Sequence, residues 1–423
     1  MSAPWIHDGR LISAHDAERL LGSKAARLIR LVDAGQSVPK FYCIKTEAFR
    51  HAVESDAGSP SLGQLLQSLA SLCDGAELDR CASEIRARLF NIPLTHDLQL
   101  EIASSQERCF PNRAAVAVRS SVCGEDGDGH SFAGMHDTVL AVNDPFGLFD
   151  AIRRVWASAF SDRAIAYRRE CGLPCTEIAP AVMVQEMIDA RQSGVLFTCN
   201  PVTGNVNEII ASAVPGLGEE LVRGECSSDS YVIDKQSRHV QPQLAVKHEK
   251  LIVSGNENGV ERVLLDEREQ SAGTLTDEQL GLIADLAISV EAHFGRPQDI
   301  EFCFDASGRL YLLQSRPVVN VDEYGPAAGN SLVWDNSNII ESYSGVTSPM
   351  TFSFIRRAYA IVYHCFAEVM GIPPRVVREH RGEFENMLGL FRGRVYYNLR
   401  NWYRLVQLFP GYQYNSRFME TMM

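Results

Sequence analysis

The feature that most constrains the fold is a pair of short apolar segments near residue 300. Residues 299–304 and 309–317 are rich in aromatic and aliphatic side chains, and the turn-forming sequence Asp-Ala-Ser-Gly at 305–308 separates them. Two such runs about a four-residue turn predict a β-hairpin. In the simplest register of that hairpin, Phe304 faces Arg309.

This register brings polar side chains together, because cross-strand partners share a face of a sheet. It pairs Glu301 with Leu312 and Asp299 with Gln314, and alternation then adds Arg316 to the same face. Carboxylate and amide oxygens could hold Mg²⁺ there, while the guanidinium binds the phosphates that the metal bridges. The alternative interpretation is a solvated sheet face with an ion pair.

A lysine stands at the start of a predicted helix near the N-terminus. Gly22-Ser23-Lys24 opens an apolar periodic segment that Gly35 can end, so Lys24 falls in the first helical turn. A cation is unfavourable at the positive end of a helix dipole unless an anion lies nearby, and phosphate is the obvious candidate. The alternative is an ordinary solvated lysine.

A second candidate cation ends a predicted strand at 115–121, where Arg119 follows a small apolar run. The glycine-rich stretch 124–138 comes next, and such a loop can bring backbone N–H groups to a ligand. An EF-hand is excluded there, since Ser131 stands where glycine is required and Asp137 where a bidentate glutamate is expected.

Two further strands are predicted at 181–187 and 194–201, and either could be a plain buried strand of a sheet. The chain has no GxxxxGK[ST] sequence, and residues 216–221 do not complete GxGxxG. P-loop and Rossmann folds are therefore excluded. If a nucleotide binds, another fold must hold it.

Composition narrows the class of protein. A chain of 423 residues with 45% hydrophobic residues suggests two or three globular domains. The net charge of −13 without a basic block disfavours nucleic acid. The sequence has neither an apolar run of membrane-spanning length nor a signal-like start, which predicts no membrane association and a cytoplasmic location. Its eleven scattered cysteines predict reduced thiols rather than disulfides or zinc.

Six motifs, taken in order and spacing over roughly residues 10–319, resemble the ATP-binding domain of phosphoenolpyruvate synthase and pyruvate phosphate dikinase. They are Gly22-Ser23-Lys24, residues 117–121 with the loop 131–134, Val184 to Met187, Gly194 to Pro201, Gly216 to Glu219, and Asp299 to Glu301 with Gln314 to Pro317. The resemblance implies an α+β ATP-grasp fold, in which two subdomains close on ATP and Mg²⁺.

The resemblance also implies roles for individual residues. Lys24 and Arg119 would contact phosphates, and Arg316 would stabilise the transferring phosphoryl group; these three form the implied catalytic set. The implied nucleotide-binding set adds the loop glycine, the adenine-pocket residues and the two magnesium ligands: Gly134, Gln185, Glu186, Met187, Glu301 and Gln314. The last two would hold the magnesium.

The chain departs from the family pattern at two places and lacks one element. It has Gly22-Ser23-Lys24 where relatives usually show Gly-Gly-Lys, and residues 213–215 lack an aromatic residue that many relatives carry. None of the eleven histidines, His130 included, has the setting of the family's phosphate-carrying histidine. We therefore expect that histidine on another domain or a separate chain.

The expected organisation is a nucleotide-binding domain at 1–319, a linker at 320–332, and the start of a mainly helical, incomplete segment at 333–423. That segment has Phe354, Ile361 and Val369 near the helical period.

The leading hypothesis is the ATP-binding and phosphorylating part of a phosphoenolpyruvate synthase-like enzyme, with pyruvate as the final acceptor. One alternative is the corresponding part of a rifampicin phosphotransferase-like or other dikinase-type enzyme with a different acceptor. An alternative of another class is a nucleotide-binding regulatory module without transfer.

Overall fold

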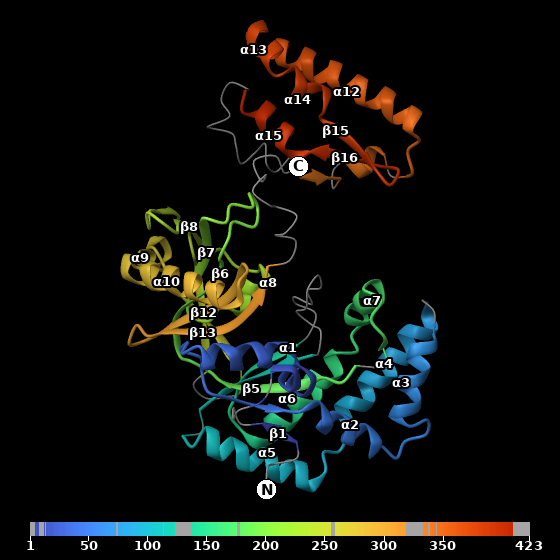
Figure 1. The fold of residues 1–423 in the computed structure, drawn as a ribbon, viewed down its shortest axis with the longest axis vertical. Helices are drawn as coiled ribbons and strands as arrows, with labels where there is room; N and C mark the ends of the chain where they lie inside the picture. The colour runs from blue at the N-terminus through green and yellow to red at the C-terminus, as the bar shows by residue number, and fades with distance from the viewer. Residues whose placement is uncertain are drawn as a thin grey trace. The chain divides into compact units, whose positions relative to one another are not determined.

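The computed structural model divides the chain into two compact units, Met1–Gly325 and Pro326–Met423 (Figure 1). It describes residues 5–7, 12, 14–72, 75–112, 114–122, 137–175, 178–254, 259–318, 333–336, 339–343 and 345–408. The predicted linker at 320–332 lies outside these residues, so the predicted domain boundaries remain predictions. The first unit mixes helices with antiparallel sheets, which confirms the α+β class.

One half of the first unit is built on a five-stranded antiparallel sheet, here called sheet A. Its strands, in spatial order, are β1 (Ile6–His7), β2 (Phe41–Ile44), β5 (Ala181–Glu186), β3 (Val116–Ser121) and β4 (Thr138–Val142). Alternate side chains such as Tyr42, Val118 and Val184 are fully buried in one core. Arg119 and Gln185 occupy the intervening positions of their strands, so their side chains lie on the other face of sheet A.

Helices cover the buried face of sheet A. They are α2 (Thr46–Glu54), α3 (Leu62–Ser71), α4 (Ala76–Asn91), α5 (His96–Cys109), α6 (Pro145–Ser158) and α7 (Asp162–Glu170). Sequence chemistry sets several of their starts: Ser61 forms a capping box with Gln64, and Asp144 caps α6 ahead of Pro145. Trp156 of α6 packs edge-on against Phe49, at 5.6 Å between ring centroids, in the middle of this core.

The other half is built on a six-stranded antiparallel sheet, called sheet B. Its order is β13 (Leu310–Pro317), β12 (Gln298–Asp305), β6 (Ala190–Phe197), β7 (Glu208–Pro215), β8 (Asp229–Asp234) and β9 (Val240–Gln243). Figure 1 shows α10 (Asp277–Phe294) lying along this sheet, where its apolar side chains join the core of β12. Thr276 and Gly295 fix the two ends of that helix.

Four shorter elements complete the half that carries sheet B. The strands β10 (Glu249–Val253) and β11 (Val260–Leu264) pair as a separate antiparallel ladder. The helices are α8 (Glu219–Arg223) and α9 (Glu267–Ser271).

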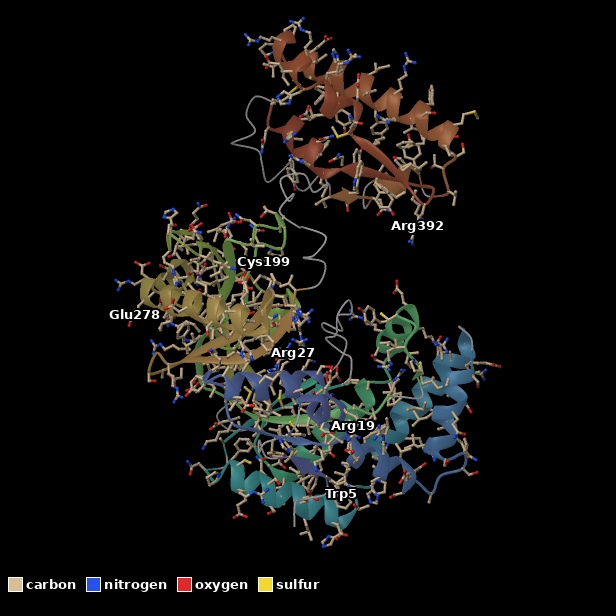
Figure 2. The ribbon with its side chains drawn as sticks, in the orientation of Figure 1. Trp5, Arg19, Arg27, Cys199, Glu278 and Arg392 are labelled. Atoms are coloured by element: carbon tan, nitrogen blue, oxygen red, sulfur yellow. The ribbon has the colours of Figure 1, made fainter. Side chains whose placement is uncertain are left out.

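Helix α1 (Ala14–Asp33) joins the two halves. It is broken at Gly22, whose φ of 78° separates a first segment from the helix that the sequence predicts after this glycine. Leu21, Leu28 and Leu31 are fully buried in a core that also contains side chains of both sheets. Arg27, labelled in Figure 2, lies over the ring of Phe294 at 5.7 Å.

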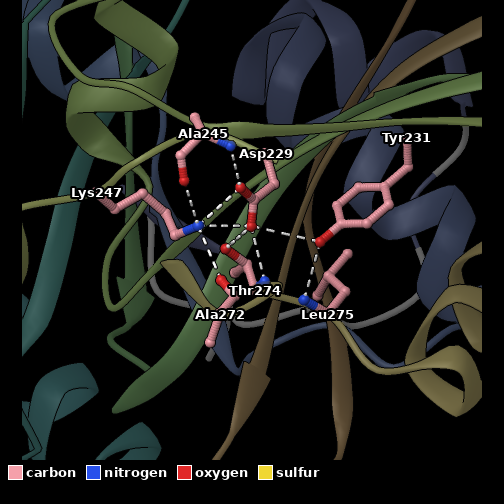
Figure 3. Close-up of polar contacts among 7 residues, drawn as sticks. All are labelled: Asp229, Tyr231, Ala245, Lys247, Ala272, Thr274 and Leu275. Atoms are coloured by element: carbon pink, nitrogen blue, oxygen red, sulfur yellow. Dashed lines mark hydrogen bonds and ion pairs between the residues drawn. The ribbon is translucent and has the colours of Figure 1, made fainter. Parts of the chain in front are cut away.

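A buried ion pair ties sheet B to the segment that follows it (Figure 3). Lys247 Nζ lies 2.7 and 2.8 Å from the carboxylate oxygens of Asp229, and the two residues are 3% and 0% exposed. The hydroxyl and the N–H of Thr274 donate to the same carboxylate, and Lys247 also donates to the Ala245 and Ala272 carbonyls. Every charge in this cluster is therefore matched by hydrogen bonds.

The second unit combines a three-stranded sheet with helices. Its strands are β14 (Trp334–Asp335), β16 (Arg394–Asn398) and β15 (Leu388–Phe391), and its helices are α11 (Ile339–Ser342), α12 (Pro349–Val369), α13 (Pro374–Glu379), α14 (Arg381–Glu385) and α15 (Leu399–Val406). The predicted helix is present as α12, capped by Ser348. The residues that suggested it do not form its buried face, because Phe354 and Val369 are 75% and 82% exposed. Ile355 and Ala367 are its buried residues.

No helix within the described ranges has the length and apolar character needed to cross a membrane.

Candidate functional site

The predicted hairpin is present as β12 and β13, but its register differs from the expected one. A bulge at Leu313 shifts the ladder, so that Phe302 pairs with Leu312 while Glu301 pairs with Gln314. Asp299 accordingly pairs with Arg316. The predicted pairs were wrong by two residues: Phe304 pairs with Leu310 instead of Arg309, and the bulge adds a second residue to β13. Asp299, Glu301, Gln314 and Arg316 nevertheless share one face, as predicted.

Arg119 of sheet A reaches the paired residues of sheet B. Its Nη2 lies 2.8 Å from Glu301 Oε2 and 2.8 Å from Gln314 Oε1. Its Nη1 donates to Gln185 Oε1 at 3.3 Å and to the Leu313 carbonyl at 3.4 Å. The bulge contributes to this arrangement, because the Leu313 carbonyl that accepts from Arg119 belongs to it. Residues from two other predicted motifs, Gln185 from one and Glu301 with Gln314 from the other, therefore meet at the Arg119 guanidinium.

The side chains that contact Arg119 are largely buried, and burial strengthens their hydrogen bonds. The Arg119 and Glu301 side chains are 13% and 19% exposed, and Gln185 is 2% exposed. A charge-assisted hydrogen bond is stronger where water has limited access. The site thus combines a held cation with a carboxylate and two amide side chains.

Arg316 forms a second ion pair along the same strands. Its Nε and Nη2 donate to Asp299 Oδ2 at 2.8 and 2.6 Å. Burial raises the pKa of the Asp299 carboxyl, and the charge and hydrogen bonds of Arg316 oppose that rise. The sequence placed Asp299 on this face without including it in the predicted site set. The structure makes it the residue that orients Arg316.

The structure places the Gly22-Ser23-Lys24 motif beside the end of β3. The Ser23 N–H donates to the Val122 carbonyl at 3.3 Å, and the Ala25 N–H donates to Ser121 Oγ at 3.1 Å. Lys24 is half-buried in the first turn after the Gly22 break. Two of the predicted phosphate-binding motifs are therefore neighbours in space.

Part of the predicted adenine pocket lines a cavity of about 410 Å³. Glu186 and Met187 contribute to its wall together with Ile188 and Tyr311. Met187 and Ile188 also pack on an apolar cluster that includes Leu251. Gln185 does not line this cavity, since its side chain turns toward Arg119 and the Leu313 carbonyl.

The segment Gly216 to Glu219 closes over this face of sheet B. Gly216 has a φ of 76°, and a Cβ atom there would lie 2.3 Å from the Leu251 carbonyl oxygen. The Leu217 N–H donates to that same oxygen at 2.8 Å. The strand that carries Leu251 was missed by the sequence analysis, because residues 249–264 have no clear apolar alternation. The predicted glycine loop with Gly134 lies outside the described residues.

The sequence matches a known domain family. A family model described as "Pyruvate phosphate dikinase, AMP/ATP-binding domain" matches residues 18–328. The chain belongs to this family. Its first unit is thus an AMP/ATP-binding domain of the pyruvate phosphate dikinase type, which confirms the resemblance seen in the motifs.

Three relatives illustrate the range of the family. The chain is 29% identical over 321 residues to a probable phosphoenolpyruvate synthase of Methanocaldococcus jannaschii, covering 75% of this chain and 26% of the relative. It is 34% identical over 319 residues to the rifampicin phosphotransferase of Bacillus subtilis, covering 74% and 36%. It is 36% identical over 307 residues to the rifampicin phosphotransferase of Streptomyces sviceus, covering 71% and 34%. The chain spans about a quarter to a third of these relatives' length.

Among solved structures, the chain is similar to D-alanyl-alanine synthetase A from Vibrio cholerae, with 12% identity and a TM-score of 0.29 over 75% of this chain and 62% of the other. At such a score the likeness says nothing about what this chain binds.

The oxygens around Arg119 fit a divalent cation that arrives with a nucleotide. Glu301 Oε2 and Gln314 Oε1 converge on one point, and both are the hard oxygen ligands that Mg²⁺ prefers. Across the described residues, no group of three or more His, Cys, Asp or Glu side chains forms a metal site. Mg²⁺ at nucleotide sites is commonly held by one or two carboxylates and completed by phosphates. The AMP/ATP-binding domain offers such a partial ligand set.

Proposed function

We propose that this AMP/ATP-binding domain binds Mg²⁺-ATP between sheets A and B and transfers phosphate to a histidine on another domain or chain. The overall reaction would convert ATP, pyruvate and water to AMP, phosphoenolpyruvate and phosphate. The observation that carries the proposal is the convergence of Arg119 of sheet A with Glu301 and Gln314 of sheet B.

The proposed roles follow from charge. Arg119, Arg316 and Lys24 would neutralise phosphate oxygens, because phosphoryl transfer depends on positioning and charge stabilisation more than on covalent help. Glu301 and Gln314 would hold Mg²⁺, which supplies a positive charge that bridges phosphate oxygens. Asp299 would keep Arg316 directed along the strand through its two-point ion pair.

Glu186 and Met187 would line the adenine pocket. Their cavity is lined by the apolar side chains of Ile188 and Tyr311 and by polar residues such as Asp305 and Ser307, and such a mixed lining suits a heteroaromatic ring. Gln185 would act at the phosphate end of the site, beside Arg119, rather than against the base.

A different final acceptor is the second candidate. The rifampicin phosphotransferases of Bacillus subtilis and Streptomyces sviceus are 34% and 36% identical to this chain, against 29% for the phosphoenolpyruvate synthase of Methanocaldococcus jannaschii. These values favour neither acceptor decisively, because the shared region is the nucleotide-binding one. A regulatory module without transfer is disfavoured, since Lys24, Arg119 and Arg316 are all retained.

The first experiment is calorimetric titration of the full chain with ATP in the presence of Mg²⁺. We expect binding and a higher melting temperature, and we expect EDTA to remove most of both effects. Absence of binding with Mg²⁺ present would overturn the proposal.

The second experiment follows label from β- and γ-labelled ATP. We expect no acid-labile phosphohistidine on this chain alone, and label on a histidine when a polypeptide carrying the family's histidine domain is added. Pyruvate and rifampicin, supplied in separate reactions with that polypeptide, distinguish the two acceptors. Product formed by this chain alone would contradict the need for a separate carrier.

A further inference from the structure

One feature of the site is still unexplained. A nitrogen of Arg119 occupies the point at which two oxygens of the kind that bind metal ions converge. Glu301 and Gln314 are direct partners in the β12–β13 ladder, so their side chains leave adjacent strands side by side. Their Oε2 and Oε1 atoms each lie 2.8 Å from the same atom, Arg119 Nη2. The guanidinium therefore stands where a cation between these oxygens would stand.

A metal ion and this guanidinium cannot share the position. The nitrogen is within hydrogen-bond distance of both oxygens, and two positive charges a few ångströms apart repel each other strongly where water is limited. The Arg119 and Glu301 side chains are mostly shielded from solvent. Metal binding at Glu301 and Gln314 thus requires Arg119 to leave.

Arg119 is also held by its other nitrogen. Nη1 donates to Gln185 Oε1 and to the Leu313 carbonyl, so the guanidinium makes contacts along both edges. Several hydrogen bonds together therefore keep Arg119 in place. A cation that arrives without an anion offers the displaced arginine no new hydrogen-bond acceptor. A nucleotide does offer one, because its phosphates accept from arginine.

From this geometry we propose that Arg119 is a built-in counter-cation that keeps the Glu301 and Gln314 oxygens closed to free divalent metal. Nucleotide phosphate draws the guanidinium away and frees the oxygens in the same event. The site then binds a metal ion only together with a nucleotide. This inference rests on the proposed function, since it assumes that phosphate reaches Arg119.

The test measures Mn²⁺ alone, without nucleotide, by the electron paramagnetic resonance signal of the free ion in the presence of the full chain. We expect Arg119→Met to lower the Kd for Mn²⁺ by at least about tenfold relative to the unmodified chain, because it removes the competing charge. The matched control is Arg238→Met, which removes an equal charge from the exposed pair with Asp285 but leaves Arg119, Arg316 and Asp299 in place. We expect its Kd to stay within about threefold of the unmodified chain.

A double variant locates the metal. Adding Glu301→Gln to Arg119→Met should abolish the gain, since it removes the carboxylate that the metal would use. If circular dichroism shows that Arg119→Met is misfolded, Arg119→Gln is measured in the same way. The inference is overturned if the Arg119 variant binds Mn²⁺ no more tightly than the unmodified chain, or if Arg238→Met gains as much. The measurement contains no nucleotide, so this failure is distinct from a failure of the ATP titration.

Discussion

Gly22 and Ser121 approach so closely that a Cβ atom on residue 22 would lie 2.0 Å from the Ser121 carbonyl oxygen. The φ of 78° at Gly22 breaks α1 at this point and starts a new helical segment directly on the end of β3. The Gly22-Ser23-Lys24 motif therefore needs its glycine for two reasons, backbone conformation and contact.

Gly22→Ala should lower the free energy of unfolding by more than about 2 kcal/mol, since a φ of 78° with a ψ of 169° is open almost only to glycine, costs an alanine about 1–3 kcal/mol, and the clash adds to it. Gly35→Ala is the control, because Gly35 has the same φ of 78° but nothing within 4 Å of a Cβ atom. Urea unfolding of both variants measures the difference. Equal losses would show that contact with Ser121 is unimportant.

Lys247→Met should destabilise the chain by about 3–5 kcal/mol, because it leaves the Asp229 carboxylate buried without its cation. Arg238→Met is the comparison, since it removes a cation from the exposed pair with Asp285, whose side chains are 43% and 70% exposed. That variant should cost less than about 1 kcal/mol. Chemical denaturation gives both values, and similar losses would contradict the importance of burial.

The same cluster predicts a pH dependence. Burial tends to raise the pKa of Asp229, but hydrogen bonds from Lys247, Thr274 and Ala245 outweigh it and hold that pKa below its ordinary value of 3.8. Because the pKa of Asp229 is lowered in the folded chain, its ionised carboxylate stabilises the fold at pH values above its pKa in the unfolded chain. This stabilisation is lost as the pH falls through its pKa in the folded chain. The stability difference between the unmodified chain and Asp229→Asn should be constant above about pH 5 and shrink below it. Melting curves from pH 3 upward, at intervals of about half a unit, test this.

Arg119→Ala and Arg316→Ala should each reduce phosphoryl transfer by roughly 10²–10³, because such donors act mainly on charge that develops in the transition state. We expect each to cost about 1–3 kcal/mol of stability, since each leaves a largely buried carboxylate without its charged partner. Transfer is measured with the partner histidine domain present, and Arg238→Ala serves as the control. Unchanged rates in both arginine variants would remove their proposed roles.

The sequence predicted the strands that consist of short apolar runs, such as β3, β5 and β12, because burial on both faces leaves a clear pattern. It also predicted which polar residues of β12 and β13 share a face. It could not predict the bulge at Leu313, because no residue type marks it and its carbonyl is used by Arg119 of a distant strand. The contact between Arg119 and Glu301 spans 182 positions, so only the family resemblance related the two.

Helix α12 of the second unit shows a different limit of prediction from sequence. Periodicity predicted α12 correctly, but the apolar residues that gave the pattern are exposed. Helical periodicity reports that a face is apolar and does not report what covers it.

The position of α1 in the chain has a consequence for synthesis. Its residues Leu21, Leu28 and Leu31 share a core with Ile300 and Leu312, so the earliest helix to leave the ribosome packs against nearly the latest strands of its unit. The other core draws only on residues up to Val184 and has all its members available much earlier. During translation α1 cannot complete this core until about 280 further residues have emerged, and nascent chains of this domain therefore expose part of it to chaperones throughout that interval.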